Sequence, residues 1–400
     1  MSALDGIHIL DLTWQGPGPF CTFILGDMGA EIIKIGAPAA AGARQTSIKK
    51  GGERELAYEA IHRNKKSLQL NLKSDEGRNV FYKLAKNTDV IVEGFRPGVA
   101  KRLNIDYPTM SKINPGIIYC SITSYGQDGP YSNLSGHDLQ CISIAGVLDL
   151  IGESDGPPIV PLNLIADYGG GGKDAAIGIL SALIARGRTG RGQFVDISLT
   201  DSSLSLITEV LSTPYFMDGV VPKRGEHDLG GAYPYYSVYK TKDGKYITLG
   251  CVEPWLWAKL CKEIGKEEFI PFDWLRERTS KEDDDKQAKE IFASLRKVFL
   301  SKTRDEWFET LGSKDVPIAK VCSLDDTFKD PQILHRQMVI EVEHPTEGKV
   351  KQMGISVKLS DTPGTVRRTA PTDGEHTDEI LAGLGYSSEK IKELHEAGIV

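Results

Sequence analysis

The first 35 residues alternate between apolar runs and a helical segment, in the order of a βαβ unit. Residues 7–12 (IHILDL) indicate a buried strand, and a Gly-Pro-Gly-Pro turn at 16–19 precedes a helix through Leu25. Residues 30–35 (AEIIKI) indicate a second strand. Two strands joined in this way by a helix lie parallel in one sheet. The pattern therefore predicts an α/β fold, with a parallel sheet covered by helices.

The same alternation continues to about residue 200, and then the character of the chain changes. Further strands are predicted at 90–93, 117–121 and 194–198, and helices at 74–86, 108–113, 174–186 and 200–211. A Lys-Asp-Gly turn between 233–239 and 246–250 indicates a hairpin, which charged helices follow. We expect a large domain of residues 1–212, completed by 340–400, a small α+β domain of residues 225–325, and linkers at 213–224 and 326–339.

Composition excludes several classes of function. The net charge of −7 argues against a nucleic-acid partner. The six cysteines include no Cys-x-x-Cys pair and the eight histidines no His-x-x-x-His pair, so we predict neither disulfides nor a metal site. No apolar run is long enough for a membrane helix, and we expect a cytoplasmic protein. Position 21 is Cys, so the turn at 16–19 lacks the third glycine of a dinucleotide fingerprint.

Two short segments could carry proton chemistry. One is Gly136-His137-Asp138, and the other is Asp167 followed by the glycine run 169–172. An imidazole and a carboxylate can take and return a proton, and glycines let a large ligand approach the backbone. The alternative interpretations are a capping or core role for His137 and a helix-capping role for Asp167.

Eight segments in order resemble the CaiB/BaiF superfamily, also called the class III CoA-transferases. They are LDGIHILDLT, GPGPFCTFILGDMGAEIIKI, NKKSLQLNLK, EGFRPGV, PGIIYCSITSYGQDGPY, PLNLIADYGGGG, RTGRGQFVDISLTD and GEHTDEIL. The resemblance implies an interlocked homodimer in which each subunit has a large Rossmann-like domain and a small domain. It also implies an acyl-CoA thioester as substrate, with no further cofactor.

Within this superfamily, two chemistries use the Asp that matches Asp167. In the transferases it attacks a thioester and becomes first an acyl anhydride and then an aspartyl-CoA thioester. In the α-methylacyl-CoA racemases it pairs with a His to exchange the proton on the carbon next to the thioester. The Gly-His-Asp setting of His137, the Glu253-Pro254 motif and the short glycine pair Gly230-Gly231 resemble the racemases.

Other features favour the alternatives. The long segment 49–64 is more like a transferase, and Cys141 stands where the racemases have a Tyr. Ala37 stands near the place where the family has an Arg that touches CoA. A CoA-transferase acting through Asp167 therefore remains the second interpretation. A non-catalytic subunit, in a heteromer with a homologous chain, is the third.

The resemblance also implies roles for individual residues. We expect His137 and Asp167 to be the two bases and Glu253 to orient His137, while backbone N–H groups after His137 hold the enolate oxygen. The acyl and oxyanion region would include Asp138, Gly169, Gly170, Gly230 and Gly231. Basic residues should bind the phosphates of CoA, and the candidates are Arg63, Lys65, Lys66 and Arg96. The alternative for these four is an ordinary solvated surface charge.

Overall fold

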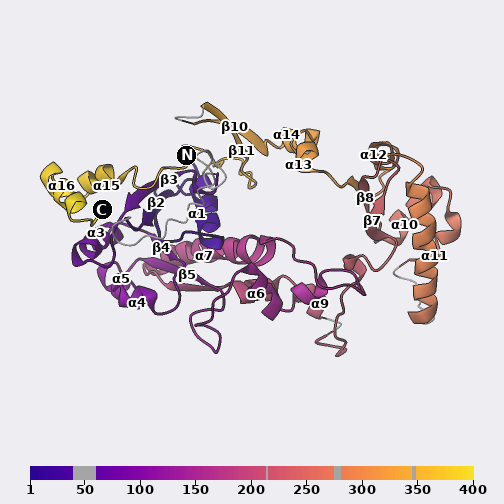
Figure 1. Cartoon of the computed structure of the whole chain (residues 1–400), viewed down its shortest axis with the longest axis horizontal. Coiled ribbons are helices and arrows are strands. Elements are labelled where there is room, and N and C mark those ends of the chain that lie inside the picture. The colour runs from indigo at the N-terminus through magenta and orange to yellow at the C-terminus, as the bar shows by residue number, and fades with distance from the viewer. Residues whose placement is uncertain (39–59, 213–214, 274–280, 345–347) are drawn as a thin grey trace. The chain divides into compact units, whose positions relative to one another are not determined.

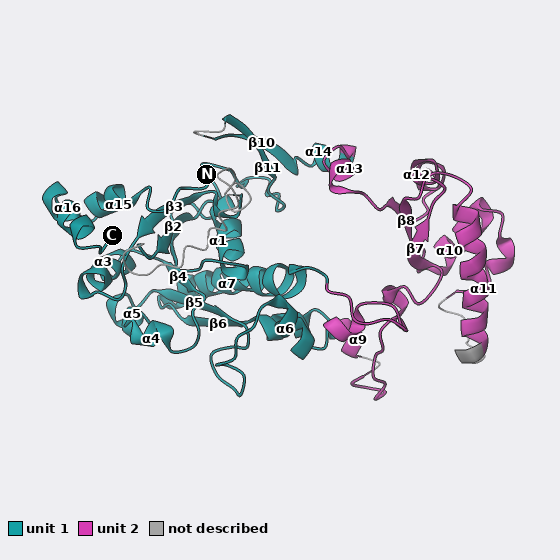
Figure 2. Ribbon diagram, in the orientation of Figure 1, with its two compact units in different colours: residues 1–147, 161–208, 332–400 teal, residues 148–160, 209–331 magenta. Residues whose placement is uncertain are grey.

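The computed structural model describes residues 1–38, 60–212, 215–273, 281–344 and 348–400 (Figure 1). Most of the transferase-like segment 49–64 and the first two residues of the predicted linker 213–224 lie outside these ranges. Contacts within the chain divide it into two compact units (Figure 2). Unit 1 comprises residues 1–147, 161–208 and 332–400, and unit 2 comprises residues 148–160 and 209–331. Residues 148–160, which the sequence placed in the large domain, thus group with unit 2.

Unit 1 is built on a six-stranded sheet in the order β3-β2-β1-β4-β5-β6, in which every neighbouring pair is parallel. Its strands are β1 (His8–Asp11), β2 (Glu31–Gly36), β3 (Lys65–Gln69), β4 (Val90–Glu93), β5 (Ile118–Thr123) and β6 (Phe194–Ser198). The predicted α/β fold with a parallel sheet is confirmed. Strand β3 was not predicted, because its sequence KKSLQ has no apolar run.

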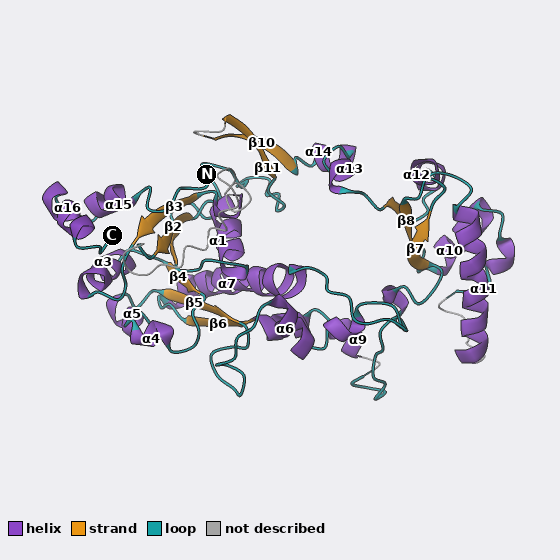
Figure 3. Cartoon of the chain, viewed as in Figure 1, coloured by secondary structure: helices purple, strands orange, loops and turns teal. Residues whose placement is uncertain are grey.

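Helices cover both faces of this sheet, as the purple and orange ribbons show (Figure 3). On one face, Leu10, Leu68 and Ile91 pack in a single apolar core with residues of α3, α5, α15 and α16. Helices α1 and α7 contact the strands from the other side, where Gly178 of α7 lies close to Val195 of β6. Alternate residues of a strand point to opposite faces, so each strand supplies both layers.

The helices of unit 1 differ in length and in how they begin. Ser74 caps α3 by accepting a hydrogen bond from the N–H of Gly77, and α1 has Pro in its first turn. The helices are α1 (Pro17–Asp27), α3 (Asp75–Ala85), α4 (Val99–Arg102), α5 (Tyr107–Ile113), α6 (Asp138–Ile144), the π-helix η4 (Leu164–Gly172), α7 (Lys173–Thr189), α8 (Leu199–Ser205), α14 (Pro331–His335), α15 (Thr377–Gly383) and α16 (Ser388–Glu396). The short helix α9 (Thr208–Ser212) spans the boundary with unit 2, and so does α14, whose first residue, Pro331, belongs to unit 2.

Unit 2 has an antiparallel sheet of three strands, β7 (Tyr236–Lys240), β8 (Tyr246–Gly250) and β9 (Ile318–Lys320). Its own apolar core includes Tyr239, Trp257 and Leu295. Its helices are α10 (Pro254–Glu263), α11 (Lys281–Phe299), α12 (Arg304–Gly312) and α13 (Leu324–Thr327). A separate antiparallel pair, β10 (Val339–His344) and β11 (Gly348–Met353), belongs to unit 1.

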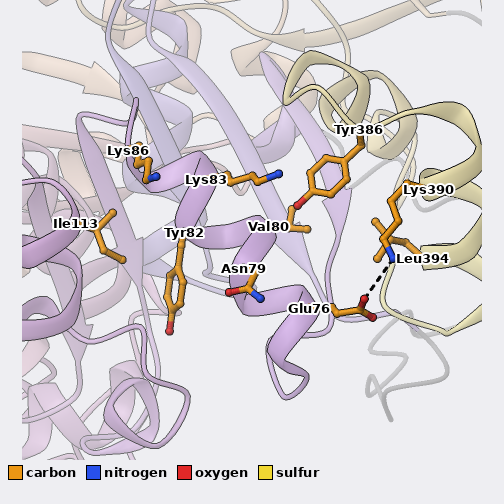
Figure 4. A pocket seen from close by; sticks show the side chains of 10 residues that line it. All are labelled: Glu76, Asn79, Val80, Tyr82, Lys83, Lys86, Ile113, Tyr386, Lys390 and Leu394. Carbon is orange, nitrogen blue, oxygen red and sulfur yellow. Dashed lines mark hydrogen bonds and ion pairs between the residues drawn. The ribbon is translucent and has the colours of Figure 1, made fainter.

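A pocket of about 580 Å³ opens between α3 and the C-terminal helices (Figure 4). The ammonium of Lys83 lies 3.9 Å from the ring centre of Tyr386. Lys390 on α16 pairs with Glu76 on α3 at 3.4 Å and with Glu393 at 3.0 Å. These contacts hold α16 against α3, on the face of the sheet that α1 and α7 do not cover.

Candidate functional site

Asp167 lies on the π-helix η4, which leads directly into α7. The glycine run lets this helix approach its neighbours closely. A Cβ at Gly170 would lie 3.0 Å from the Cβ of Ser202 on α8, and one at Gly172 would lie 2.9 Å from the ring of Phe20 on α1. A Cβ at Gly169 would lie 2.9 Å from the carbonyl oxygen of Leu164. Gly170 and Gly172 therefore serve helix packing, whereas a Cβ at Gly169 would meet only its own helix, and the role of Gly169 and Gly170 beside an acyl group stays a prediction.

Asp138 ties the start of α6 to the helix that carries Asp167. Its Oδ2 accepts hydrogen bonds from the backbone N–H groups of Ala166 (2.6 Å) and Asp167 (2.9 Å). The side chain is buried, and its Oδ1 has no hydrogen-bond partner in the described part of the chain. The Asp138 carboxylate thus supports η4 from within, and its predicted place in the acyl and oxyanion region stays a prediction.

The carboxylate of Asp167 is half-buried against the loop before α1. A Cβ at Gly16 would lie 3.1 Å from Oδ2 of Asp167, so only glycine allows this approach. Asn163 donates a hydrogen bond from Nδ2 to the same oxygen at 3.0 Å. Burial raises the pKa of Asp167 above its ordinary value, against the opposing effect of the Asn163 hydrogen bond. The negative charge of Asp138 also raises this pKa, whereas His137 lowers it.

His137 is the N-cap residue of α6, and it is exposed. Its backbone N–H donates to Oε1 of Gln140 at 3.1 Å. Because its charge acts on the pKa of Asp167, the imidazole lies within electrostatic reach of that carboxylate. The fold therefore brings together the two residues that the sequence singled out, from α6 and η4.

Cys141 lies one turn after His137 and is fully buried. Burial raises the pKa of its thiol to about 11, and its Sγ contacts the carbonyl oxygen of Ser124 at 3.5 Å. A thiol held in its protonated form is a poor nucleophile. This residue therefore fills space behind the His137 turn.

Lys65 and Lys66 point to opposite faces of the sheet, because they are consecutive residues of β3. Lys65 is fully buried and pairs with Asp11 at 3.1 Å. Lys66 is partly exposed and pairs with Glu379 of α15 at 2.6 Å. Arg63, just before the strand, is also fully buried and bonds both carboxylate oxygens of Asp27, at 2.9 and 2.6 Å. The internal bonds of Arg63 and Lys65 argue against the phosphate-binding role that we predicted for them.

Arg96 has the surroundings expected of a ligand-binding cation. It is exposed, and its Nη2 donates to the hydroxyl of Ser135, two residues before His137. It follows β4, and ligands of parallel sheets bind beyond the carboxyl ends of the strands. Its role in CoA binding remains a prediction.

The remaining predicted residues belong to unit 2. Glu253 is the N-cap residue of α10, and its carbonyl oxygen accepts from the N–H of Trp257 at 3.0 Å. Gly230 ends a short 3-10 turn, and Gly231 follows with a φ of 88°, which favours glycine. The roles of Glu253, Gly230 and Gly231 beside His137 remain predictions.

Sequence reasoning missed three residues that shape the surroundings of Asp167, namely Asn163, Gly16 and Asp11. Asn163 precedes Asp167 by four residues, and on a helix such a spacing places two side chains together. Asp11 ends β1, where a charged residue after an apolar strand is a signal of a site. Within the described ranges no group of three metal-ligating side chains occurs, and no helix is long and apolar enough to cross a membrane.

Comparison with known proteins gives consistent matches over the whole chain. Residues 4–377 match the family model "CoA-transferase family III". The chain is 33% identical to human alpha-methylacyl-CoA racemase, over all of this chain and 97% of that protein. It is 34% identical to human succinyl-CoA:glutarate CoA-transferase, over 99% of this chain and 90% of that protein. The crystal structure of a CAIB/BAIF family protein from Brucella suis superposes with a TM-score of 0.80 at 29% identity, covering 96% of this chain and 99% of that one.

Proposed function

The chain belongs to CoA-transferase family III, an enzyme family, and we propose that it exchanges the α-proton of a 2-methylacyl-CoA thioester. The observation that carries this proposal is the contact between α6 and η4: Asp138, which follows His137, accepts a hydrogen bond from the backbone N–H of Asp167, and Asp167 is a carboxylate whose pKa burial raises. The relatives include a racemase and transferases at similar identity, so the choice between them rests on the site.

In the proposed reaction, one base removes the α-proton and the other returns a proton to the opposite face. With one enantiomer the neutral imidazole of His137 takes the proton, and the protonated Asp167 carboxyl then delivers its own. With the other enantiomer the roles reverse. Asp167 must therefore be protonated in one direction and ionised in the other, and a raised pKa favours its use as an acid.

The intermediate between the two proton transfers is an enolate, whose oxygen needs a hydrogen-bond donor. The backbone N–H of Asp138, in the first turn of α6, would supply it. Arg96, beside the His137 loop, would bind a phosphate of CoA. The resemblance further implies that Glu253 orients the imidazole.

We further propose that the chain works as an interlocked dimer. Apolar side chains stand exposed on one stripe of α7, with Ile177 and Ile184 each about 60% exposed and seven residues apart. Ile144 of α6 is exposed as well. An apolar surface of this kind is typical of a subunit interface. Light scattering after gel filtration tests this proposal, and a monomer at micromolar concentration would contradict it.

Incorporation of deuterium from heavy water into a 2-methylacyl-CoA tests the reaction. We expect wild-type protein to exchange the α-hydrogen and His137→Ala to lose at least about a hundredfold in rate, as for removal of a general base. An unchanged rate of α-deuterium exchange in His137→Ala would contradict the role of His137 as a base.

The alternative is a CoA-transferase, and the 34% identity to a human CoA-transferase favours keeping it. Here the ionised Asp167 would attack the thioester carbonyl, which releases the CoA thiolate and forms a mixed anhydride between Asp167 and the acyl group. The thiolate would then attack the Asp167 carbonyl of this anhydride, which forms the aspartyl-CoA thioester and releases the acyl group as a carboxylate. Hydroxylamine added after an acyl-CoA would then modify Asp167. Trapping at Asp167 without α-exchange would establish transferase activity. Exchange of the α-hydrogen without trapping would establish racemase activity.

A further inference from the structure

A buried ion pair lies beneath the loop that joins β1 to α1. Asp11 and Lys65 are both completely buried, and Lys65 Nζ lies 3.1 Å from Asp11 Oδ2. The ammonium also donates to the hydroxyl of Thr22 at 2.7 Å and to the carbonyl oxygen of Pro19 at 3.2 Å. Its hydrogen bonds therefore reach the first turns of α1 as well as the end of β1.

Asp11 binds the loop from both sides. Its Oδ1 accepts from the backbone N–H of Thr13 at 2.9 Å and from the Thr13 hydroxyl, and its Oδ2 accepts from the Thr22 hydroxyl at 2.6 Å. Burial alone would raise the pKa of Asp11, but Lys65 and these hydrogen bonds hold it below its ordinary value. One ionised carboxylate thus fixes the chain before and after Gly16.

The same loop and the start of α1 contact the helix that carries Asp167 at three places. Gly16 lies against the Asp167 carboxylate, and the carbonyl of Pro17 faces Gly172. The ring of Phe20 meets the ring of Tyr168 edge-on, with centres 4.9 Å apart. Gly16 has a φ of 63°, so this backbone shape needs both glycine and a firm hold on its two ends.

We propose that the Asp11–Lys65 ion pair is a positioning device for Asp167: it fixes loop 13–20 so that Gly16 lies against the reactive carboxylate. This inference rests on the proposed function, in which Asp167 reacts as a base or as a nucleophile. A buried ion pair is seldom more stabilising than an apolar pair of the same size. An apolar pair at these positions could fill the space but could not bond Thr13, Pro19 and Thr22.

Thr22→Val tests the proposal with least disturbance, because it keeps the shape and the ion pair while it removes the bridging hydroxyl. The matched control is Thr88→Val, since Thr88 is also buried and donates to a helix carbonyl, that of Leu84. Lys65→Met is the stronger variant. Each protein is studied by amide hydrogen exchange with mass spectrometry and by α-deuterium exchange with a 2-methylacyl-CoA.

We expect Thr22→Val to speed amide exchange in residues 163–173 by about tenfold, while α16 keeps its protection. The kcat for α-exchange should fall by about tenfold with KM changed less than about twofold, because positioning acts on the reacting group. Lys65→Met should enlarge both effects, and Thr88→Val should leave both unchanged. Wild-type protection of 163–173 in a folded Lys65→Met or Thr22→Val protein would overturn the proposal. If wild-type protein shows neither α-exchange nor trapping, the proposed function fails, whereas the amide measurement still decides the positioning role.

Discussion

Two carboxylates end neighbouring strands of the parallel sheet, Asp11 on β1 and Glu93 on β4, and both are buried. Asp11 pairs in register with Val92, so Glu93, one residue later, points to the opposite face of the sheet. Asp11 has the ammonium of Lys65 beside it. Glu93 instead accepts from the hydroxyl of Ser121 and from the N–H of Phe95.

The two groups consequently differ in charge. The pKa of Asp11 lies below its ordinary value, whereas burial raises the pKa of Glu93 to about 7. Each carboxylate anchors the loop after its strand, through Thr13 on one face and Phe95 on the other. Burial is common to both, so the partner decides whether the anchor is ionised at neutral pH.

Removing the cation should produce the largest effect. In Lys65→Met a carboxylate is left buried without its counter-ion, and we expect the free energy of unfolding to fall by about 3–5 kcal/mol. Asp11 should then resemble Glu93, with a pKa above its ordinary value. The loss, measured by urea denaturation, should therefore be greater at pH 8 than at pH 5.

Two further variants make this test specific. Lys390→Met removes a solvent-accessible ammonium that pairs with Glu76, and it should cost far less than Lys65→Met, because solvent screens such a pair. Asp11→Asn combined with Lys65→Met removes both charges and should recover part of the loss. If Lys65→Met and Lys390→Met lowered the free energy of unfolding equally, the buried cation would not be what distinguishes Asp11 from Glu93.

The second prediction concerns Glu93. The folded chain keeps this proton up to about pH 7, whereas the unfolded side chain releases it near its ordinary value of 4.5. The free energy of unfolding should therefore decrease as the pH rises between those values, by at most about 3 kcal/mol. Glu93→Gln cannot ionise and should lose this dependence. Parallel stability curves for the two proteins from pH 5 to pH 8 would show that Glu93 titrates normally.

The sequence predicted the strands that are strongly apolar, and it missed β3. Strands such as Val90–Glu93 are apolar throughout their interior, which is typical of parallel sheets buried on both faces. Strand β3 contains two lysines, and one of them is buried only because Asp11, 54 residues earlier, pairs with it. Such a partner cannot be inferred from local pattern, and the sequence therefore predicted for Lys65 a phosphate-binding role, with a solvated surface charge as the alternative.

The helix of Asp167 shows the same limit. From the sequence we expected its glycine run to let a ligand approach the backbone, and in the structure the run forms the end of a π-helix. Glycine is required at positions 170 and 172 because Ser202 of α8 and Phe20 of α1 leave no room for a Cβ. Both neighbours are distant in the sequence. The residues Asp167 and His137 could be chosen from their chemistry, but the contacts that tune them come from the tertiary fold.

Gly16→Ala extends the comparison from the ion pair to the loop that it anchors. Gly16 and Gly6 both have positive φ, at 63° and 83°, but a Cβ at Gly6 would touch nothing. We expect both alanine variants to lose about 1–2 kcal/mol of stability from backbone strain. Only Gly16→Ala should also lower kcat for α-exchange, by about tenfold, because its methyl displaces the Asp167 carboxylate. Equal kcat values for α-exchange in Gly16→Ala and Gly6→Ala would show that the loop around Gly16 does not affect the reaction.

The smallest expected effect concerns Asn163. Asn163 gives the Asp167 carboxylate a neutral hydrogen-bond donor, whereas the Asp11 carboxylate has the cation of Lys65 as its partner. Its hydrogen bond to Asp167 favours the ionised carboxylate, so Asn163→Ala should raise the pKa of Asp167 further. A hydrogen bond to a charged group contributes about 1.5–3 kcal/mol before solvent replaces it, and Asn163 is exposed. The acidic limb of the pH–rate profile should move to higher pH, because the base form of Asp167 then appears later, while the rate in the plateau stays within about twofold. Asn79→Ala on α3 is the control and should leave the profile in place. A limb that stays fixed or moves to lower pH in Asn163→Ala would mean that Asp167 is not the group that titrates there.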